Sequence, residues 1–284
     1  MKKYTTILLS LSIFLVFTSA QASSLERLFA PKAKLWDTWL AHSPDSSKNI
    51  DHQAWTGFLQ RYVIEQADGI NRVDYGNVTD ADKQQLKEYI LNLSRLEISS
   101  YSRAEQLNYW INLYNALTID VILEHYPVSS IRKIDLSPGL FKDGPWAKKL
   151  LRIQGEEVSL NDIEHRILRP IWKDPRLHYA LNCASIGCPN LQKQAYTTGN
   201  IDTLFRKAAE DFINHPRGVN FSNEKLVLSS IYNWFRNDFG RNDEEILDHI
   251  RQYASDELRQ QLNKVNPDIR YRYDWSLNDT ASAK

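Results

Sequence analysis

The feature that most constrains the fold is a helix predicted from Arg103 to about Glu124, because it is apolar on almost every side. A capping box, Ser102-Arg103-Ala104-Glu105, marks its start, since the Ser and Glu side chains can each satisfy a free backbone N–H. Its apolar side chains are those of Leu107, Trp110, Ile111, Leu113, Tyr114, Leu117, Ile119, Val121 and Ile122. A helix with such a surface belongs in the middle of a domain.

One polar stripe interrupts this apolar surface. Glu105, Asn108, Asn112 and Asn115 follow one another at steps of three, four and three, which places them on one face of the helix. Asn is a poor helix former, and a buried amide without a partner costs ~1–3 kcal/mol. The stripe therefore predicts either a structural hydrogen-bond network or one wall of a polar pocket. In the second case Asn108, Asn112 and Asn115 are candidate binding residues.

Helices are predicted in most of the remaining chain, with short strands between them. The other predicted helices begin at Asp51 and at Thr79 or Asp80, and cover 231–238, 244–263 and a short segment from 159 that Pro170 closes. The predicted strands form hairpins at 150–159 and 219–228, an alternating strand at 177–182, and a last strand within 269–275. This mixture predicts an α+β fold: a mostly helical single domain with a small, mainly antiparallel sheet around the central helix.

The first 22 residues have the three parts of a secretory signal peptide. Lys2 and Lys3 supply positive charge, an apolar run follows from Ile7 to Phe17, and Ala20-Gln21-Ala22 offers small residues for cleavage. The run is shorter than the ~20 residues that span a bilayer. We therefore expect cleavage, no stable membrane insertion afterwards, and a periplasmic or secreted protein. An uncleaved anchor is the alternative.

Charge and length narrow the class of protein further. The chain has 35 Lys and Arg and 35 Asp and Glu, and cleavage would remove two lysines. Without a long basic block, binding of nucleic acid is not expected. The expected divisions are the signal peptide (1–22), an N-terminal helical segment (23–72), the main domain (73–278) and a disordered tail (279–284).

The two cysteines, Cys183 and Cys188, lie together in a loop after the predicted strand 177–182. Export favours a disulfide between them, which would fix the shape of the loop. A second interpretation makes Cys183 a nucleophile activated by a histidine. The two cysteines do not have the CxxC spacing of a redox pair, and the sequence has no HExxH or paired CxxC motif that would indicate a metal site. No metal and no cofactor are therefore expected.

Several polar residues near this loop are candidates for a shared site. Glu164, His165 and Arg169 lie on the short helix from 159, and His178, Asn182 and Ser185 lie on or after the strand. The primary prediction is a polar pocket that binds a small molecule or peptide without catalysis.

The alternative is a cysteine-dependent hydrolase or acyl transferase. Cys183 would be the nucleophile, His178 or His165 the base, and Asn112 an orienting or oxyanion donor. If the sulfurs are bonded, Glu164 and His165 remain as acid and base. Hydrogen-bonded core histidines and ordinary ion pairs are the structural alternative.

Several long segments resemble the domain of unknown function 547 family. They are 105–116, 159–165, 176–189, 228–239 and 273–278. The resemblance covers roughly Val73 to Asn278 and implies no assigned activity. It implies bacterial members that are often exported, and eukaryotic members joined to glutaredoxin-like or DEP domains. That association suggests thiol chemistry or signalling by analogy.

Overall fold

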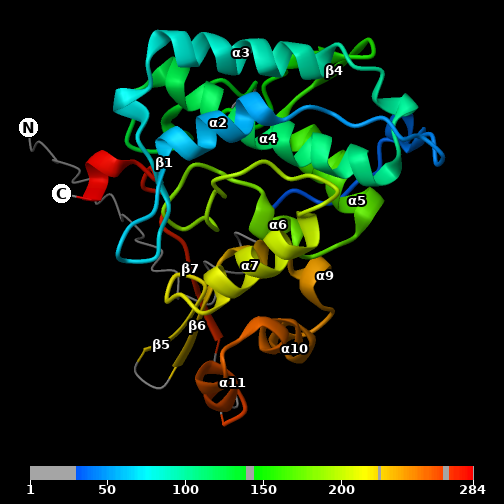
Figure 1. The fold of residues 1–284 in the computed structure, drawn as a ribbon. Coiled ribbons are helices and arrows are strands. Elements are labelled where there is room, and N and C mark those ends of the chain that lie inside the picture. The colour runs from blue at the N-terminus through cyan, green and yellow to red at the C-terminus, as the bar shows by residue number, and fades with distance from the viewer. Residues whose placement is uncertain (1–29, 139–143, 223–224, 265–268, 284) are drawn as a thin grey trace, which may run out of the picture.

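The computed structural model describes residues 30–138, 144–222, 225–264 and 269–283. The predicted central helix is confirmed as α4 (Arg103–His125), and the Ser102 hydroxyl accepts a hydrogen bond from the Glu105 N–H at 3.3 Å. Helix α3 (Asp80–Ser94), capped by Thr79, packs along α4, and α2 (Gln53–Tyr62) packs on α3. Figure 1 shows these three helices together in the upper half of the molecule.

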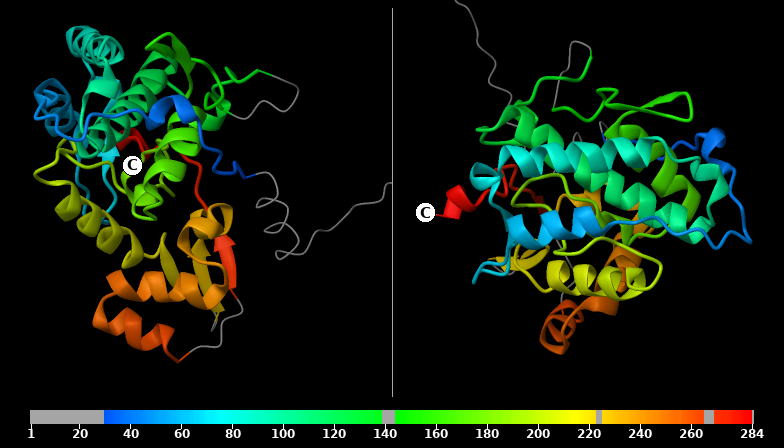
Figure 2. Two further views of the ribbon diagram at one scale, coloured as in Figure 1. Left: turned by 90° about the vertical axis from the view of Figure 1, so that its right-hand side faces the viewer. Right: turned by 45° about the horizontal axis from the view of Figure 1, so that its top comes forward.

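The lower half holds the later helices. They include α7 (Ile201–Ile213), α10 (Asp243–Tyr253) and α11 (Asp256–Leu262). The short α5 (Arg169–Trp172) and α6 (Leu177–Ala180) precede α7 in the chain, and the short α8 (Ile231–Trp234) and α9 (Arg236–Phe239) lie between α7 and α10. The 3₁₀ turns are η1 (Asp37–Leu40), η2 (Tyr75–Asn77), η3 (Ile98–Ser100), η4 (Ile131–Lys133) and η6 (Thr280–Ala283). One π-helix, η5 (Asp162–Leu168), runs directly into α5. In the left view of Figure 2, α10 and α11 lie beside the C-terminal sheet, away from α3 and α4.

The described strands fall into three small sheets. Strands β1 (Val63–Ile64) and β2 (Arg72–Val73) pair antiparallel, as do β3 (Leu151–Ile153) and β4 (Glu156–Val158). The third sheet has the order β5 (Val219–Ser222), β6 (Lys225–Ser229), β7 (Ile269–Arg272). In it β5 and β6 are antiparallel, and β6 and β7 are parallel with Leu226 opposite Ile269. The predicted mostly helical α+β class is therefore confirmed.

Two hydrophobic cores correspond to the two halves. The larger core surrounds α4 and includes Trp39, Trp55 and Phe58 from the N-terminal segment. The smaller core joins α7, α10 and the three-stranded sheet through residues such as Phe212 and Ile250. The N-terminal segment thus packs into the same core as α4.

Three local predictions differ from the structure. Residues 177–182 do not form a strand: Leu177–Ala180 is helix α6, and all four of its residues are buried. Pro170 does not end its helix: η5 runs directly into α5, Pro170 is the second residue of α5, and α5 continues to Trp172. The tail is ordered at its start: Tyr126 donates a hydrogen bond to buried Asp279 at 2.9 Å, and Thr280 donates one to Asp74 at 3.0 Å.

The expected signal peptide lies outside the described residues, which begin at 30. Within the described ranges, no helix combines the length and the hydropathy needed to cross a bilayer.

Candidate functional site

Two asparagines of the polar stripe of α4 form hydrogen bonds with backbone groups of neighbouring segments. Asn112 donates to the Tyr196 carbonyl at 2.8 Å and accepts from the Tyr196 N–H at 3.0 Å. Asn115 donates to the Ala180 carbonyl at 2.9 Å and accepts from the Asn182 N–H at 2.8 Å. Each side chain thus satisfies one buried donor and one buried acceptor, as a neighbouring strand would. Both residues are buried and act as structural clamps in this structure.

Asn108 behaves differently from its neighbours on the stripe. Its side chain is fully buried, and neither its oxygen nor its nitrogen bonds to any described residue. The Asn182 amide nitrogen is likewise buried without a partner among those residues, although its oxygen accepts from the Ala184 N–H at 3.1 Å.

Glu164 is the centre of a buried polar cluster under α4. The Tyr114 hydroxyl, from α4, donates to its Oε2 at 3.0 Å. Its Oε1 lies 3.7 Å from Nδ1 of His165 and 3.9 Å from Nδ1 of His178. The structure therefore brings together Glu164, His165 and His178, as the sequence predicted, although both histidine nitrogens are beyond direct hydrogen-bond distance.

Asp238 fixes His178 from the opposite side of the ring. Its Oδ2 is 2.7 Å from His178 Nε2 and 2.6 Å from Arg169 Nε. Burial raises the pKa of Asp238, but the hydrogen bonds from His178 and Arg169 outweigh it and lower that pKa to about 2. The His178 ring also stacks on Phe235, with centroids 4.4 Å apart and planes 11° apart. His178 is thus held by Nε2–H, with Nδ1 facing Glu164.

His165 is held as a neutral ring. Arg169 donates through Nη1 to His165 Nδ1 at 2.9 Å, so that nitrogen carries no proton. Burial lowers the pKa of His165 to about 4; the charge of Glu164 opposes this shift, and that of Arg169 adds to it. Arg169 also binds the Pro31 carbonyl at 2.8 Å, which ties the N-terminal segment to this cluster.

The predicted Cys183–Cys188 disulfide is not present, and both cysteines are free thiols. The Cys183 N–H donates to the Cys188 sulfur at 3.1 Å, and the Cys188 thiol donates to the Leu181 carbonyl at 3.4 Å. Hydrogen bonds of Cys188 therefore hold the shape of the loop, a role that the sequence analysis gave to a disulfide.

The Cys183 thiol sits among hydrogen-bonding groups. Its Sγ lies 2.8 Å from the Tyr273 hydroxyl and 3.4 Å from the Ser185 hydroxyl, and those two hydroxyls are 2.8 Å apart. Hydrogen bonding from Cys188, then from Ser185 and Tyr273, lowers the pKa of Cys183 against the effect of burial. Burial raises the pKa of Cys188 well above its usual value. Cys183 is thus the more acidic of the two thiols.

The predicted cysteine–histidine contact does not form. Among the described residues, no histidine lies within hydrogen-bond distance of Cys183 Sγ. Cys183 is linked to the cluster electrostatically, because the negative charge of Glu164 raises the pKa of Cys183.

Partly exposed aromatic rings cluster with Tyr273, whose hydroxyl contacts the thiol. Tyr273 lies 4.6 Å from Trp275 and 4.8 Å from Trp234, measured between ring centroids. Trp234 stacks on Trp275 at 5.5 Å, and Trp146 meets Trp275 at 5.7 Å. These rings form an apolar rim beside a polar, acidic centre.

Sequence reasoning gave no role to Tyr114, Asp238 or Tyr273. Asp238 is 60 positions from His178 and Tyr273 is 90 positions from Cys183. Both belong to segments that carry the family resemblance, which was the available signal for them.

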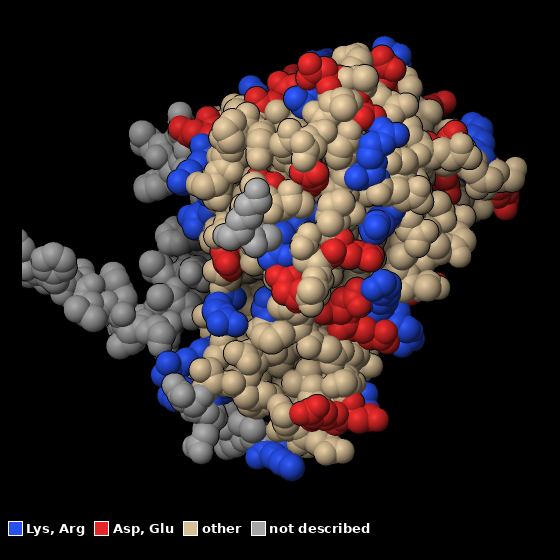
Figure 3. Space-filling model, turned by 60° about the vertical axis from the view of Figure 1, so that its left-hand side comes forward, with Lys and Arg blue, Asp and Glu red and all other residues tan. Residues whose placement is uncertain are grey.

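Elsewhere on the surface, a polar pocket of about 780 Å³ opens between β1, α7 and the loop after Cys188. None of the predicted site residues lines it. On the face shown in Figure 3, acidic and basic side chains are interspersed rather than segregated. Within the described residues, no cluster of His, Cys, Asp and Glu is arranged to hold a metal ion.

The buried histidines predict a stability that depends on pH. The pKa of His165 is about 4 in the folded protein and 6.5 in an unfolded chain, so the unfolded state binds more protons between these values. The free energy of unfolding should therefore fall as the pH drops from about 7 to about 4. Burial lowers the pKa of His52 and of His249 to about 4 as well, which acts in the same direction.

Urea unfolding at several pH values measures this effect. His165→Gln keeps an acceptor for Arg169 and should reduce the slope by roughly 1.4 kcal/mol per pH unit in that range. His42→Gln, at an exposed position, serves as the matched control. An unchanged slope in His165→Gln would show that His165 is not held neutral.

Comparison with known proteins gives a family match over part of the chain. No curated protein and no solved structure matches the chain. Residues 98–213 match the model of a family described as protein of unknown function, DUF547. That range contains α4, η5, α6, the cysteine loop and α7, while Asp238 and Tyr273 lie beyond it. The chain therefore carries a DUF547 family domain, as its sequence motifs predicted.

Proposed function

We propose that the domain is a thiol-dependent hydrolase or acyl transferase with Cys183 as its nucleophile. The observation that carries this proposal is the hydrogen bonding of Cys183 Sγ, a free thiol 2.8 Å from the Tyr273 hydroxyl with a lowered pKa. Donors around a sulfur stabilise its thiolate, and the thiolate is the form that attacks a carbonyl carbon.

The adjacent cluster supplies the proton that such a reaction needs. When Sγ bonds to the carbonyl carbon, the leaving oxygen or nitrogen must take up a proton. His178 is held by Asp238 through Nε2, and its other ring nitrogen, Nδ1, lies 3.9 Å from Glu164 Oε1. In the proposed reaction a proton on Nδ1 passes to the leaving group, and the ring keeps the proton on Nε2. Water or a second acceptor then attacks the thioester and frees Cys183.

An activated ester tests the proposal. With p-nitrophenyl acetate, we expect a burst of nitrophenol equal to the enzyme concentration, with the acetyl group on Cys183 by peptide mass mapping. Cys183→Ala should abolish the burst. Tyr273→Phe should raise the pH at which the burst rate is half-maximal, because the thiolate loses a donor, whereas Tyr253→Phe serves as the matched control. A full burst in Cys183→Ala, or no acetylation of Cys183, would contradict the proposal.

Ligand binding without catalysis is the second candidate, at the same site. It is favoured by the aromatic rim of Trp146, Trp234 and Trp275, and by the lack of a direct histidine contact with Cys183 among the described residues. Such a domain would take a small molecule or peptide with an apolar group. The ester assay separates the candidates, because binding alone acetylates no cysteine.

We also propose that the protein is exported and cleaved after Ala22. The support is the order of Lys2 and Lys3, the apolar run and Ala20-Gln21-Ala22. In a bacterial host, protein from the periplasmic fraction should have Ser23 as its N-terminal residue by Edman sequencing or mass spectrometry. A cytoplasmic protein that retains the segment 1–22 would contradict export.

A further inference from the structure

The polar pocket is built from four segments of the chain. They contribute Gln60, Glu65 and Gln66 near β1, Gly69 and Asn71 before β2, the run Asn190 and Gln192–Gln194, and Leu204, Lys207, Asp211, Asn214 and His215 on or after α7. Its volume of about 780 Å³ is in the range of small-ligand sites. Leu204 is the one aliphatic side chain among these residues, so a ligand would be recognised by polar contacts.

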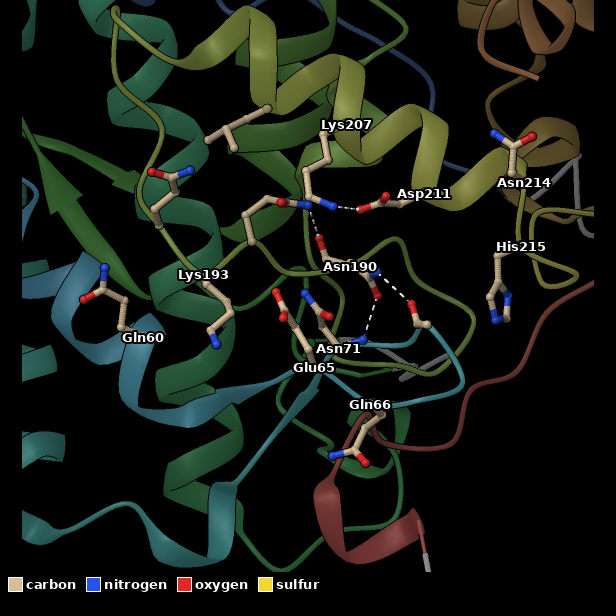
Figure 4. A pocket seen from close by; sticks show the side chains of 14 residues that line it. Gln60, Glu65, Gln66, Asn71, Asn190, Lys193, Lys207, Asp211, Asn214 and His215 are labelled. Carbon is tan, nitrogen blue, oxygen red and sulfur yellow. Dashed lines mark hydrogen bonds and ion pairs between the residues drawn. The ribbon is translucent and has the colours of Figure 1, made fainter. Parts of the chain in front are cut away.

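Part of the lining forms a fixed frame. Asn190 accepts from the Asn71 N–H at 2.8 Å and from Arg217 at 2.6 Å, and it donates to the Gly69 carbonyl at 3.0 Å. Asn71 donates in turn to the Leu191 carbonyl at 2.9 Å. Figure 4 shows Asn190 in the middle of the pocket, joined to Asn71 by a dashed line. The wall is therefore formed before any ligand arrives.

Other side chains of the lining are left without protein partners. Gln60, Gln66 and Gln194 make no side-chain hydrogen bond to another described residue. A carboxamide offers both a donor and an acceptor, as a peptide group does. Three such side chains around one cavity suit a ligand that contains peptide groups.

The charges of the lining are balanced and only partly paired. Lys207 and Asp211 form an ion pair at 2.6 Å. Glu65 and Lys193 make no ion pair within the part of the chain that the structure describes. Figure 4 shows Glu65 and Lys193 on the side of Asn190 away from Lys207 and Asp211. One free carboxylate and one free ammonium group thus share a wall of the pocket.

His215 adds no charge to this set. Its Nδ1 accepts from the Arg217 N–H at 3.1 Å, and its Nε2 donates to the Asp68 carbonyl at 2.8 Å. Both ring nitrogens are therefore occupied by backbone groups, and burial lowers the pKa of His215. The recognition of charge falls to Glu65 and Lys193.

We propose that this pocket binds a short peptide with both termini free. Glu65 would pair with the ammonium group, Lys193 with the carboxylate, and the free glutamines with the peptide group between them. An anion such as phosphate would be repelled by Glu65 and Asp211, and a cation would be repelled by Lys193 and Lys207. A neutral sugar would leave both free charges unpaired, and the lining offers no aromatic ring besides His215 for stacking.

Calorimetric titration of the purified protein with dialanine tests this proposal. We expect saturable binding of dialanine and about tenfold weaker binding of both N-acetyl-dialanine and dialanine amide. Lys193→Gln should weaken dialanine binding to the level of the amide and leave the affinity for the amide unchanged. Glu65→Gln should do the same with respect to the N-acetyl form. Lys148→Gln and Glu88→Gln, at exposed positions outside the pocket, are the matched controls.

Three outcomes would overturn the proposal. The first is no binding of dialanine up to about 10 mM, a concentration that reveals even millimolar affinity. The second is equal binding of glucose or inorganic phosphate. The third is equal binding of the blocked and free dipeptides, because the two charges would then have no role. The titration does not depend on the thiol, so Cys183→Ala should bind dialanine as the native protein does.

Discussion

The fold depends on two asparagine side chains of the buried helix α4. They form the backbone hydrogen bonds that a neighbouring strand would otherwise provide. The chain around Ala180, Asn182 and Tyr196 is buried, and none of the described strands bonds its backbone at these residues. Asn115 and Asn112 supply one donor and one acceptor each to this backbone, at 2.8–3.0 Å. Buried backbone groups left unpaired would each cost about 1–3 kcal/mol. These clamps explain why a helix otherwise apolar carries a stripe of poor helix formers.

The same clamped loop serves both polar sites. Its first part presents Cys183 to Tyr273 and Ser185, and its second part places Asn190 in the wall of the pocket. Arg217 ties the two parts together, because it donates to the Ile186 carbonyl at 3.1 Å and to Asn190 at 2.6 Å. The proposed thiol chemistry requires that both sulfurs stay reduced after the proposed export, since a disulfide would remove the nucleophile.

The sequence predicted those features of the structure that depend on local residue patterns. Helix α4, the hairpins β3–β4 and β5–β6, and the meeting of Glu164 with His165 and His178 follow from periodicity and from motif position. The segment 177–182 misled because its alternation of residues imitates a half-buried strand, whereas tertiary contacts bury all of α6. Asp238 and Tyr273 could not be assigned because their contacts join positions far apart in the chain. The disulfide followed from the expected compartment rather than from any geometry.

Hydrogen exchange tests the clamp most directly. The N–H of Asn182 lies outside any helix or strand, yet its bond to Asn115 should protect it as strongly as the amides of α4. In Asn115→Ala, exchange measured residue by residue by NMR should accelerate at Asn182 while the Tyr196 N–H, held by Asn112, stays protected. If the Asn182 amide exchanges as fast in the native protein as in Asn115→Ala, the asparagine does not hold the loop, and the account of how this fold positions Cys183 is wrong.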